Sequence, residues 1–128
     1  MRKNIGVFRG KHKDKEEWVQ GNYLCLHQSD DTDLHIIVDE HGIYNPIDPE
    51  TVGEETGMTD ANGLSIFEGD IVEFDNGFIS HIGKIAFSKG NWVVGDIGYL
   101  YVYMRDNAIL IGNIHDNPEL LEAGKANT

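Results

Sequence analysis

The stretch from Thr56 to Phe74 constrains the fold of this chain most, because it combines tight turns with the start of a strand. Glycines at positions 57, 63 and 69 surround the apolar pair Ile66-Phe67. Glycine adopts the left-handed backbone that tight turns require, and the residues from Asp70 onward have the composition of a half-buried strand. The stretch therefore predicts short strands joined by tight turns, and it indicates a backbone shape rather than a reaction.

The rest of the second half repeats this pattern of strand and turn. Asn76-Gly77 is a strong hairpin signal, because both residues tolerate the left-handed conformation. The sequence of the second half predicts five short strands. Five short strands are too few for two full sheets, and they favour a small, strongly bent SH3-like barrel. Asn117-Pro118 has the composition of a helix start, which predicts a short C-terminal helix. The expected strands span residues 70–74, 78–87, 92–94, 99–104 and 108–114.

The first half predicts a β-hairpin module. Aromatic and apolar runs indicate strands at 18–26 and 34–38, and a turn at 39–42 leads into a returning strand. Two prolines within residues 45–55 mark a connection, because proline cannot continue a hydrogen-bonded ladder. We therefore expect a mainly β protein with one domain over residues 1–128, divided into an N-terminal hairpin part (1–55), a barrel-like part (56–122) and a tail (123–128).

The charge of the chain disfavours binding to double-stranded nucleic acid. The formal net charge is -12, although six of the ten Lys and Arg residues lie within residues 1–15. Proteins bind a phosphate backbone through Lys and Arg, and an acidic body repels it. The basic N-terminal segment is interpreted as an arm that is solvated, lies against the acidic body or contacts an external ligand.

The single cysteine, Cys25, provides no disulfide framework, which fits a reducing cytoplasm. It lies between Leu24 and Leu26, where we expect a small buried thiol. Cys25 and His27 would share one face of a strand, but core packing accounts for them better than nucleophilic catalysis does. No apolar run approaches the length of a membrane helix, so we expect no membrane association.

The histidines could supply a metal site, but their spacings do not favour one. None of the pairs has the one- or four-residue offset that places ligands together on a strand or a helix. His35 and His41 flank the first turn, where a structural pair is favoured over a zinc centre. We therefore expect no metal, no cofactor and no catalytic residue. The histidines are His12, His27, His35, His41, His81 and His115.

Three tyrosines form the best candidate binding feature in the sequence. Tyr99, Tyr101 and Tyr103 alternate along one expected strand, so they would emerge on a single face. Such a row suits recognition of a partner, and it equally suits packing against the hairpin module or a second subunit. Glu68 and Asp70 could bind a cation at the barrel rim, but we favour turn chemistry, with Asp70 accepting backbone N–H groups.

Four ordered stretches of the chain resemble the YopX family of small proteins from bacterial phages and prophages. The resemblance implies a mostly β protein with a barrel-like C-terminal half, and it implies no known activity. We assign a structural role in turns to Gly57, Asn62, Gly63, Glu68, Gly69, Asp70, Gly112, Asn113, Asn117 and Pro118. The four stretches are Phe8–Lys11 leading to Glu17–Gly21, Asp48–Gly53, Thr56–Gly63 running into Ile66–Val72, and Ile111–Leu121.

Three functions fit these observations. The first is a noncatalytic phage or prophage accessory protein in the cytoplasm of the bacterial host, which binds an unknown protein partner or forms a homo-oligomer through strand edges. The second is an acidic inhibitor that imitates nucleic acid and binds a host DNA-binding protein. The third is a small barrel that binds single-stranded nucleic acid through the basic arm and the tyrosine row.

Overall fold

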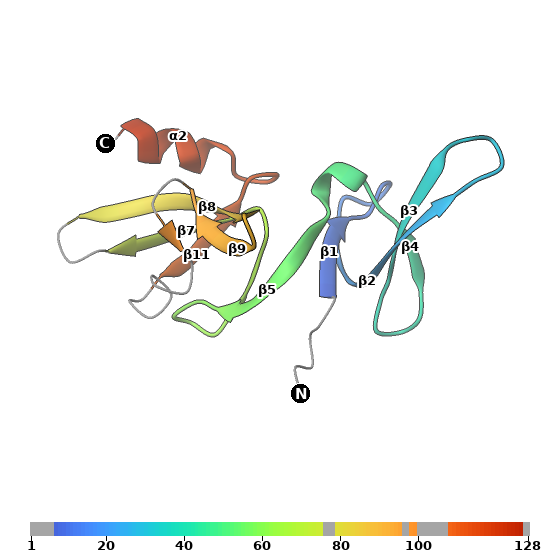
Figure 1. The fold of residues 1–128 in the computed structure, drawn as a ribbon, viewed down its shortest axis with the longest axis horizontal. Coiled ribbons are helices and arrows are strands. Elements are labelled where there is room, and N and C mark those ends of the chain that lie inside the picture. Colours follow the sequence, from blue (N-terminus) through green and yellow to red (C-terminus); the bar gives the residue numbers. More distant parts are fainter. Residues whose placement is uncertain (1–6, 76–78, 96–97, 100–107, 127–128) are drawn as a thin grey trace. The chain divides into compact units, whose positions relative to one another are not determined.

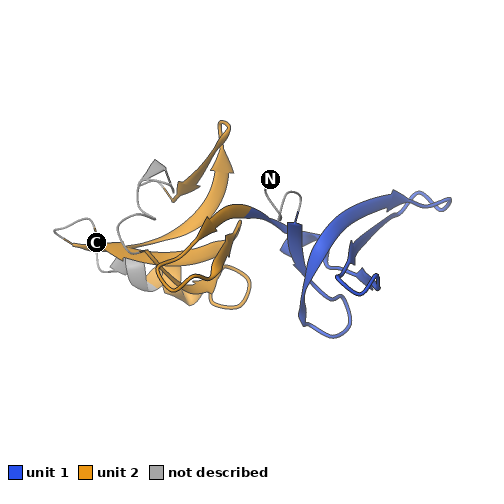
Figure 2. Cartoon of the chain, turned by 90° about the horizontal axis from the view of Figure 1, so that it is seen from below, with its two compact units in different colours: residues 1–55 blue, residues 56–128 orange. Residues whose placement is uncertain are grey.

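The computed structural model describes residues 7–75, 79–95, 98–99 and 108–126. These residues form two antiparallel sheets and one short α-helix (Figure 1). The prediction of a mainly β protein with a short C-terminal helix is therefore confirmed. The chain divides into two compact units, residues 1–55 and residues 56–128 (Figure 2). Among the described residues, no helix has the length and hydrophobicity needed to cross a membrane.

Unit 1 is built around the N-terminal strand, which the sequence analysis treats as part of a basic arm. Strand β1 pairs antiparallel with β2 on one side and with β5 on the other. The guanidinium carbon of Arg9 lies 4.6 Å from the centre of the Trp18 ring, and Lys11 Nζ lies 5.6 Å from it. Cation–π contacts of this kind hold basic side chains on a sheet. The elements are β1 (Val7–Lys11), β2 (Trp18–His27), β3 (Asp33–Val38), β4 (Tyr44–Pro46), the 3-10 helix η1 (Pro49–Thr51) and the start of β5 (Gly53–Thr59), which continues into unit 2.

The core of unit 1 contains side chains from β3 and from the segment that follows β4. Ile37 and Ile47 are buried, and a Cβ added to Gly10 would clash with the Ile47 side chain. Gly10 therefore lets β1 approach the segment after β4 closely. The prolines that the sequence analysis placed in a connection fit this arrangement. Pro46 ends β4, the outer strand in the order β4-β3-β2-β1-β5-β6, in which β6 is Ser65–Phe67, and Pro49 starts η1.

The far end of the β2–β3 hairpin is a two-stranded ribbon. Strand β1 pairs with residues 18–22 of β2, and β4 pairs with residues 36–38 of β3. In the described part of the chain, residues 23–27 therefore pair only with β3. Figure 1 shows this end of the hairpin extending past the short strand β4 to a loop. The outer edge of β2 at residues 23–27 consequently lacks a pairing strand among the described residues.

Unit 2 contains an open five-stranded antiparallel sheet in the order β10-β9-β8-β7-β11. Helix α2 packs against β8. The core consists of Ile66, Val72, Phe74, Ile85, Val94 and Ala108, with Met58, Trp92 and Leu110 packed against it. The elements are β6 (Ser65–Phe67), β7 (Asp70–Asp75), β8 (Ser80–Ser88), β9 (Asn91–Val94), β10 (Gly98–Tyr99), β11 (Ile109–Asn113) and α2 (Glu119–Ala126).

The strand predictions for unit 2 agree with the structure within one or two residues wherever the structure describes them. Lys89 and Gly90 both have positive φ, 52° and 83°, which is the backbone of the tight turn expected between β8 and β9. The expected turn at Asn76-Gly77 and most of the expected strand at 99–104 lie outside the described residues. The strand order does not include a pairing of β10 with β11 among the described residues, so the sheet is described as open rather than as a closed barrel.

Candidate functional site

One face of the β2–β3 ribbon is apolar and exposed. Leu24 and Leu26 lie on the same side of β2, because side chains alternate along a strand, and their exposed fractions are 38% and 45%. Leu26 is paired with Leu34 across the hairpin. Tyr44 lies on the same face through its pairing with Val38, and it is 64% exposed. We call the surface formed by Leu24, Leu26, Leu34 and Tyr44 the apolar face.

The opposite face of the ribbon carries metal-ligand and hydrogen-bonding groups. Cys25 is paired with His35 across the hairpin, and His27 is paired with Asp33. One ligand atom from each of Cys25, Asp33 and His35 lies within 4.8 Å of the other two. We call these three residues the ligand cluster. They provide a sulfur and an oxygen atom from exposed side chains and a nitrogen atom from a half-buried one.

Neighbouring side chains hold two members of the ligand cluster in place. The hydroxyl of Tyr23 is hydrogen-bonded to His35 Nδ1 at 2.5 Å, and the two rings stack with centres 5.9 Å apart. His27 Nδ1 is bonded to Asp33 Oδ1 at 3.0 Å. Burial raises the pKa of Tyr23 above its ordinary value, and the nearby Cys25 and Asp33 raise it further. Tyr23 and His27 therefore orient the imidazole and the carboxylate.

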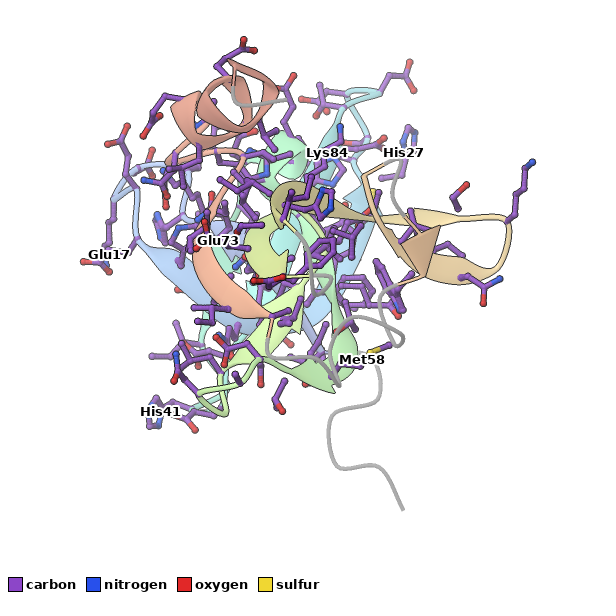
Figure 3. The ribbon with its side chains drawn as sticks, turned by 90° about the vertical axis from the view of Figure 1, so that its left-hand side faces the viewer. Glu17, His27, His41, Met58, Glu73 and Lys84 are labelled. Atoms are coloured by element: carbon purple, nitrogen blue, oxygen red, sulfur yellow. The ribbon has the colours of Figure 1, made fainter. Side chains whose placement is uncertain are left out.

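Two expectations for this region are wrong. Cys25 is exposed rather than buried, because it lies on the two-stranded part of the hairpin. His35 and His41 do not form the expected structural pair. The His35 ring contacts Tyr23, whereas His41 Nε2 lies 3.5 Å from Glu40 Oε1 in the turn before β4. Figure 3 shows the labelled side chains of His27 and His41 well apart.

The tyrosine row is described only in part. The backbone of Tyr99 ends β10 and pairs with Val93 of β9. The side chain of Tyr99, and the whole of Tyr101 and Tyr103, lie outside the described residues. The binding strip proposed from the sequence therefore stays a prediction.

Several motif residues belong to a loop centred on Asp60, a residue that the sequence analysis did not single out. Asp60 Oδ1 accepts the backbone N–H groups of Asn62 and Leu64, and Oδ2 accepts that of Leu110 on β11. Gly63 has a φ of 84°, which suits glycine. Gly57 is also left-handed, with a φ of 84° inside β5.

Burial of the Asp60 carboxyl opposes ionisation, but the backbone N–H groups favour the charged form more strongly. The result is a pKa of Asp60 below its ordinary value. The same loop occurs in unit 1, where Asp39 Oδ1 accepts the N–H groups of His41 and Ile43. Gly42 there has a φ of 76°. The signal that could have revealed both loops is the repeated pattern Asp-x-x-Gly-x at residues 39–43 and 60–64.

The second group of motif residues forms the corner before β7. Asp70 is 1% exposed, and its Oδ2 accepts the N–H of Phe67 at 2.8 Å, the type of bond that the turn interpretation expects. Gly69 has a φ of 90°, and it donates to the carbonyl of Ile85 and accepts from the N–H of Ile114. Glu68 lies in the same corner.

The third group connects β11 to α2. Asn113 Oδ1 accepts the N–H groups of His115 and Asp116. Asn117 Oδ1 accepts the N–H of Asn113, and Pro118 precedes the helix. A Cβ on Gly112 would lie 2.6 Å from Asn117 Oδ1, so only glycine fits without a shift. These residues therefore have contacts that fix the approach of α2.

Two antiparallel sheets followed by a short C-terminal helix define a small, mainly β protein. The model of the YopX protein family matches residues 7–122, and the chain therefore belongs to the YopX family.

The fold is also similar to a solved structure, that of protein EF1440 from Enterococcus faecalis. The sequences are 24% identical, the TM-score is 0.59, and the match covers 89% of this chain and 96% of that chain. At this identity the likeness shows the fold alone. A comparison with curated proteins finds no match.

Proposed function

We propose that this protein is a noncatalytic accessory protein of phage or prophage origin that acts in the cytoplasm by binding another protein. Membership of the YopX family supports the origin. The observation that carries the binding role is the apolar face, because Leu24, Leu26 and Tyr44 are exposed on one side of the sheet.

An exposed row of large apolar side chains is typical of a surface that is covered by a partner. Leu24 and Leu26 of β2 and Tyr44 of β4 present aliphatic and aromatic groups on one side of the sheet, and burial of such groups supplies most of the free energy of association. The alternating pattern keeps polar groups on the opposite side. A partner protein can therefore cover the apolar face without desolvating charged groups there.

A second copy of this chain is the first partner to test. Light scattering after size-exclusion chromatography, over a range of protein concentrations, measures the mass. We expect a mass that rises with concentration and a lower mass for Leu26→Lys, because the introduced charge must be desolvated on association. Ser88→Lys is the matched control, since Ser88 is exposed on β8 in unit 2.

The tagged full chain and both variants are then used for affinity capture from the bacterial host. A monomer mass at every concentration would remove self-association from the proposal. If the Leu26→Lys variant captures the same proteins in the same amounts as the wild type, the apolar face is not the binding surface. If neither experiment detects a partner, the binding role fails.

A further inference from the structure

The ligand cluster arises from the register of the β2–β3 hairpin. Cys25 and His35 are directly opposite each other, and Asp33 lies two residues from His35 on the same face. Cross-strand neighbours have Cβ atoms about 5 Å apart. Three different ligand types from two strands are thus brought together by backbone pairing, although no spacing along the chain reveals them.

The atoms of the cluster are close to the separation that a metal ion needs. The ligands of a tetrahedral Zn²⁺ ion are 2.0–2.3 Å from the metal and hence roughly 3.5 Å from one another. The three ligand atoms here lie within 4.8 Å of each other. Cys25 and Asp33 are exposed, so small rotations of their side chains can close the difference.

Two further side chains support the ligands as outer partners do in metal sites. Tyr23 is hydrogen-bonded to His35 Nδ1, so a metal-bound His35 keeps this bond only if it ligates through Nε2. His27 holds one oxygen of Asp33, which leaves the other oxygen of the carboxylate. Hydrogen bonds of this kind fix the orientation of ligating imidazole and carboxylate groups.

The ribbon itself gives a physical reason for a metal at this position. Two strands that pair only with each other are marginally stable in water. A metal that joins β2 to β3 through Cys25 and His35 would stabilise the part of the hairpin where β2 has no second pairing strand within the described residues.

We propose that Cys25, Asp33 and His35 form a binding site for one divalent transition-metal ion of the Zn²⁺ type. The thiolate and the imidazole favour such an ion over Mg²⁺ or Ca²⁺, which prefer oxygen ligands. Binding releases the thiol proton to solvent, and a water molecule occupies the fourth position. This site replaces our expectation of no metal, and it does not depend on the proposed protein-binding function.

The test uses the full chain, freed of metal and kept reduced with a phosphine reductant. Zn²⁺ is titrated calorimetrically, and Co²⁺ is added separately as a spectroscopic probe. We expect one ion per chain and a thiolate-to-cobalt charge-transfer band. Cys25→Ser should abolish that band, and Cys25→Ser and His35→Gln should each weaken Zn²⁺ binding at least tenfold. Tyr23→Phe should weaken it by about tenfold, as loss of an outer partner does.

Two controls separate this site from unspecific binding and from unfolding. His41→Gln removes an exposed imidazole of the same unit that lies beside Glu40 in the turn before β4 and is not a member of the ligand cluster, and it should leave the affinity unchanged. Far-ultraviolet circular dichroism confirms that each variant retains its β structure. Wild-type protein that binds no Zn²⁺, or a folded Cys25→Ser variant that binds Zn²⁺ as tightly as the wild type, would overturn the proposal.

Discussion

At the scale of single residues, buried aspartates organise the turns of this protein. Asp60 satisfies three backbone N–H groups, two within its own loop and one on β11. Asp70 accepts the N–H of Phe67 in the corner before β7. A carboxylate accepts several hydrogen bonds at once, whereas an amide accepts through one oxygen and adds donors of its own. Replacement of such an aspartate by asparagine therefore removes hydrogen-bond acceptors as well as a charge.

Asp60→Asn should destabilise the protein at neutral pH by about 1–3 kcal/mol, because at least one buried N–H group loses its acceptor. The pKa of Asp60 is lowered in the folded state. Its carboxylate therefore stabilises the fold above the unfolded-state pKa of about 3.9, and this contribution is lost as the pH falls through the lower folded-state pKa. The difference between wild type and variant should shrink in acid.

Urea unfolding at neutral and at acidic pH measures both effects. Asp31→Asn is the control, because it removes the same charge from a side chain that is 96% exposed. An Asp60→Asn midpoint equal to that of the wild type at neutral pH would contradict the prediction.

The two aspartates also show what the sequence could and could not reveal at this scale. The bond from Phe67 to Asp70 was predictable, because an aspartate beside a glycine commonly accepts nearby N–H groups. The bond from Leu110 to Asp60 joins residues 50 positions apart. It depends on the pairing of distant strands, so no local pattern reveals it.

At the scale of elements, the sequence revealed the strands that are rich in aromatic, β-branched and other apolar residues. Strands β2, β3, β7 and β8 have this composition and were predicted. Strand β1 has two basic residues among its five, and β5 contains two glycines and two threonines. Their extended conformation is fixed by partners, β1 by β2 and β5 by β1. The composition of β1 and β5 therefore does not predict strands, and these segments are extended because they pair with other strands.

The ligand cluster belongs to the same scale. Cys25 and His35 become neighbours only when the hairpin register is known, and the register is set by the loop from Gln28 to Thr32. That loop has no glycine, and its left-handed position is filled by Asp31 with a φ of 66°. The polar residues indicate a loop between the two expected strands, but they do not fix which residues pair across the hairpin, so the cluster was missed.

Gly112→Ala should loosen the junction of β11 and α2. The new Cβ would lie 2.6 Å from Asn117 Oδ1 and 2.9 Å from Leu120 Cδ1, so the start of the helix must move. We expect a loss of about 1–3 kcal/mol in unfolding free energy, as for overpacking in a core. Urea unfolding measures the change in unfolding free energy. Faster hydrogen exchange at the amides of α2 would show that the loss of stability is at the helix.

Ile109→Ala is the control for this prediction, because Ile109 lies on the same strand and is 41% exposed. Its effect should be smaller, and it should not increase exchange in α2. Equal stability of Gly112→Ala and wild type would show that the helix start adapts to the added methyl group.

At the scale of the whole molecule, the net charge disfavours binding to nucleic acid. The net charge is -12, and the basic residues concentrate in the N-terminal segment. The structure places Arg9 and Lys11 of that segment in strand β1, against the ring of Trp18. These two residues are part of a paired strand in unit 1. They therefore belong to the sheet of unit 1 rather than to an arm separate from it.

The chain should consequently show no binding to duplex DNA in an electrophoretic mobility assay at low salt, where electrostatic attraction is strongest. Duplex DNA carries about one negative charge per 1.7 Å, and binding requires Lys and Arg to displace the counterions around it. A single-stranded oligonucleotide of the same length is tested in parallel, because small β barrels bind such strands by stacking bases on aromatic side chains. A duplex shift that weakens steeply as salt is added would contradict the prediction from net charge. A shift with the single strand alone would instead favour the alternative function in which the tyrosine row binds nucleic acid.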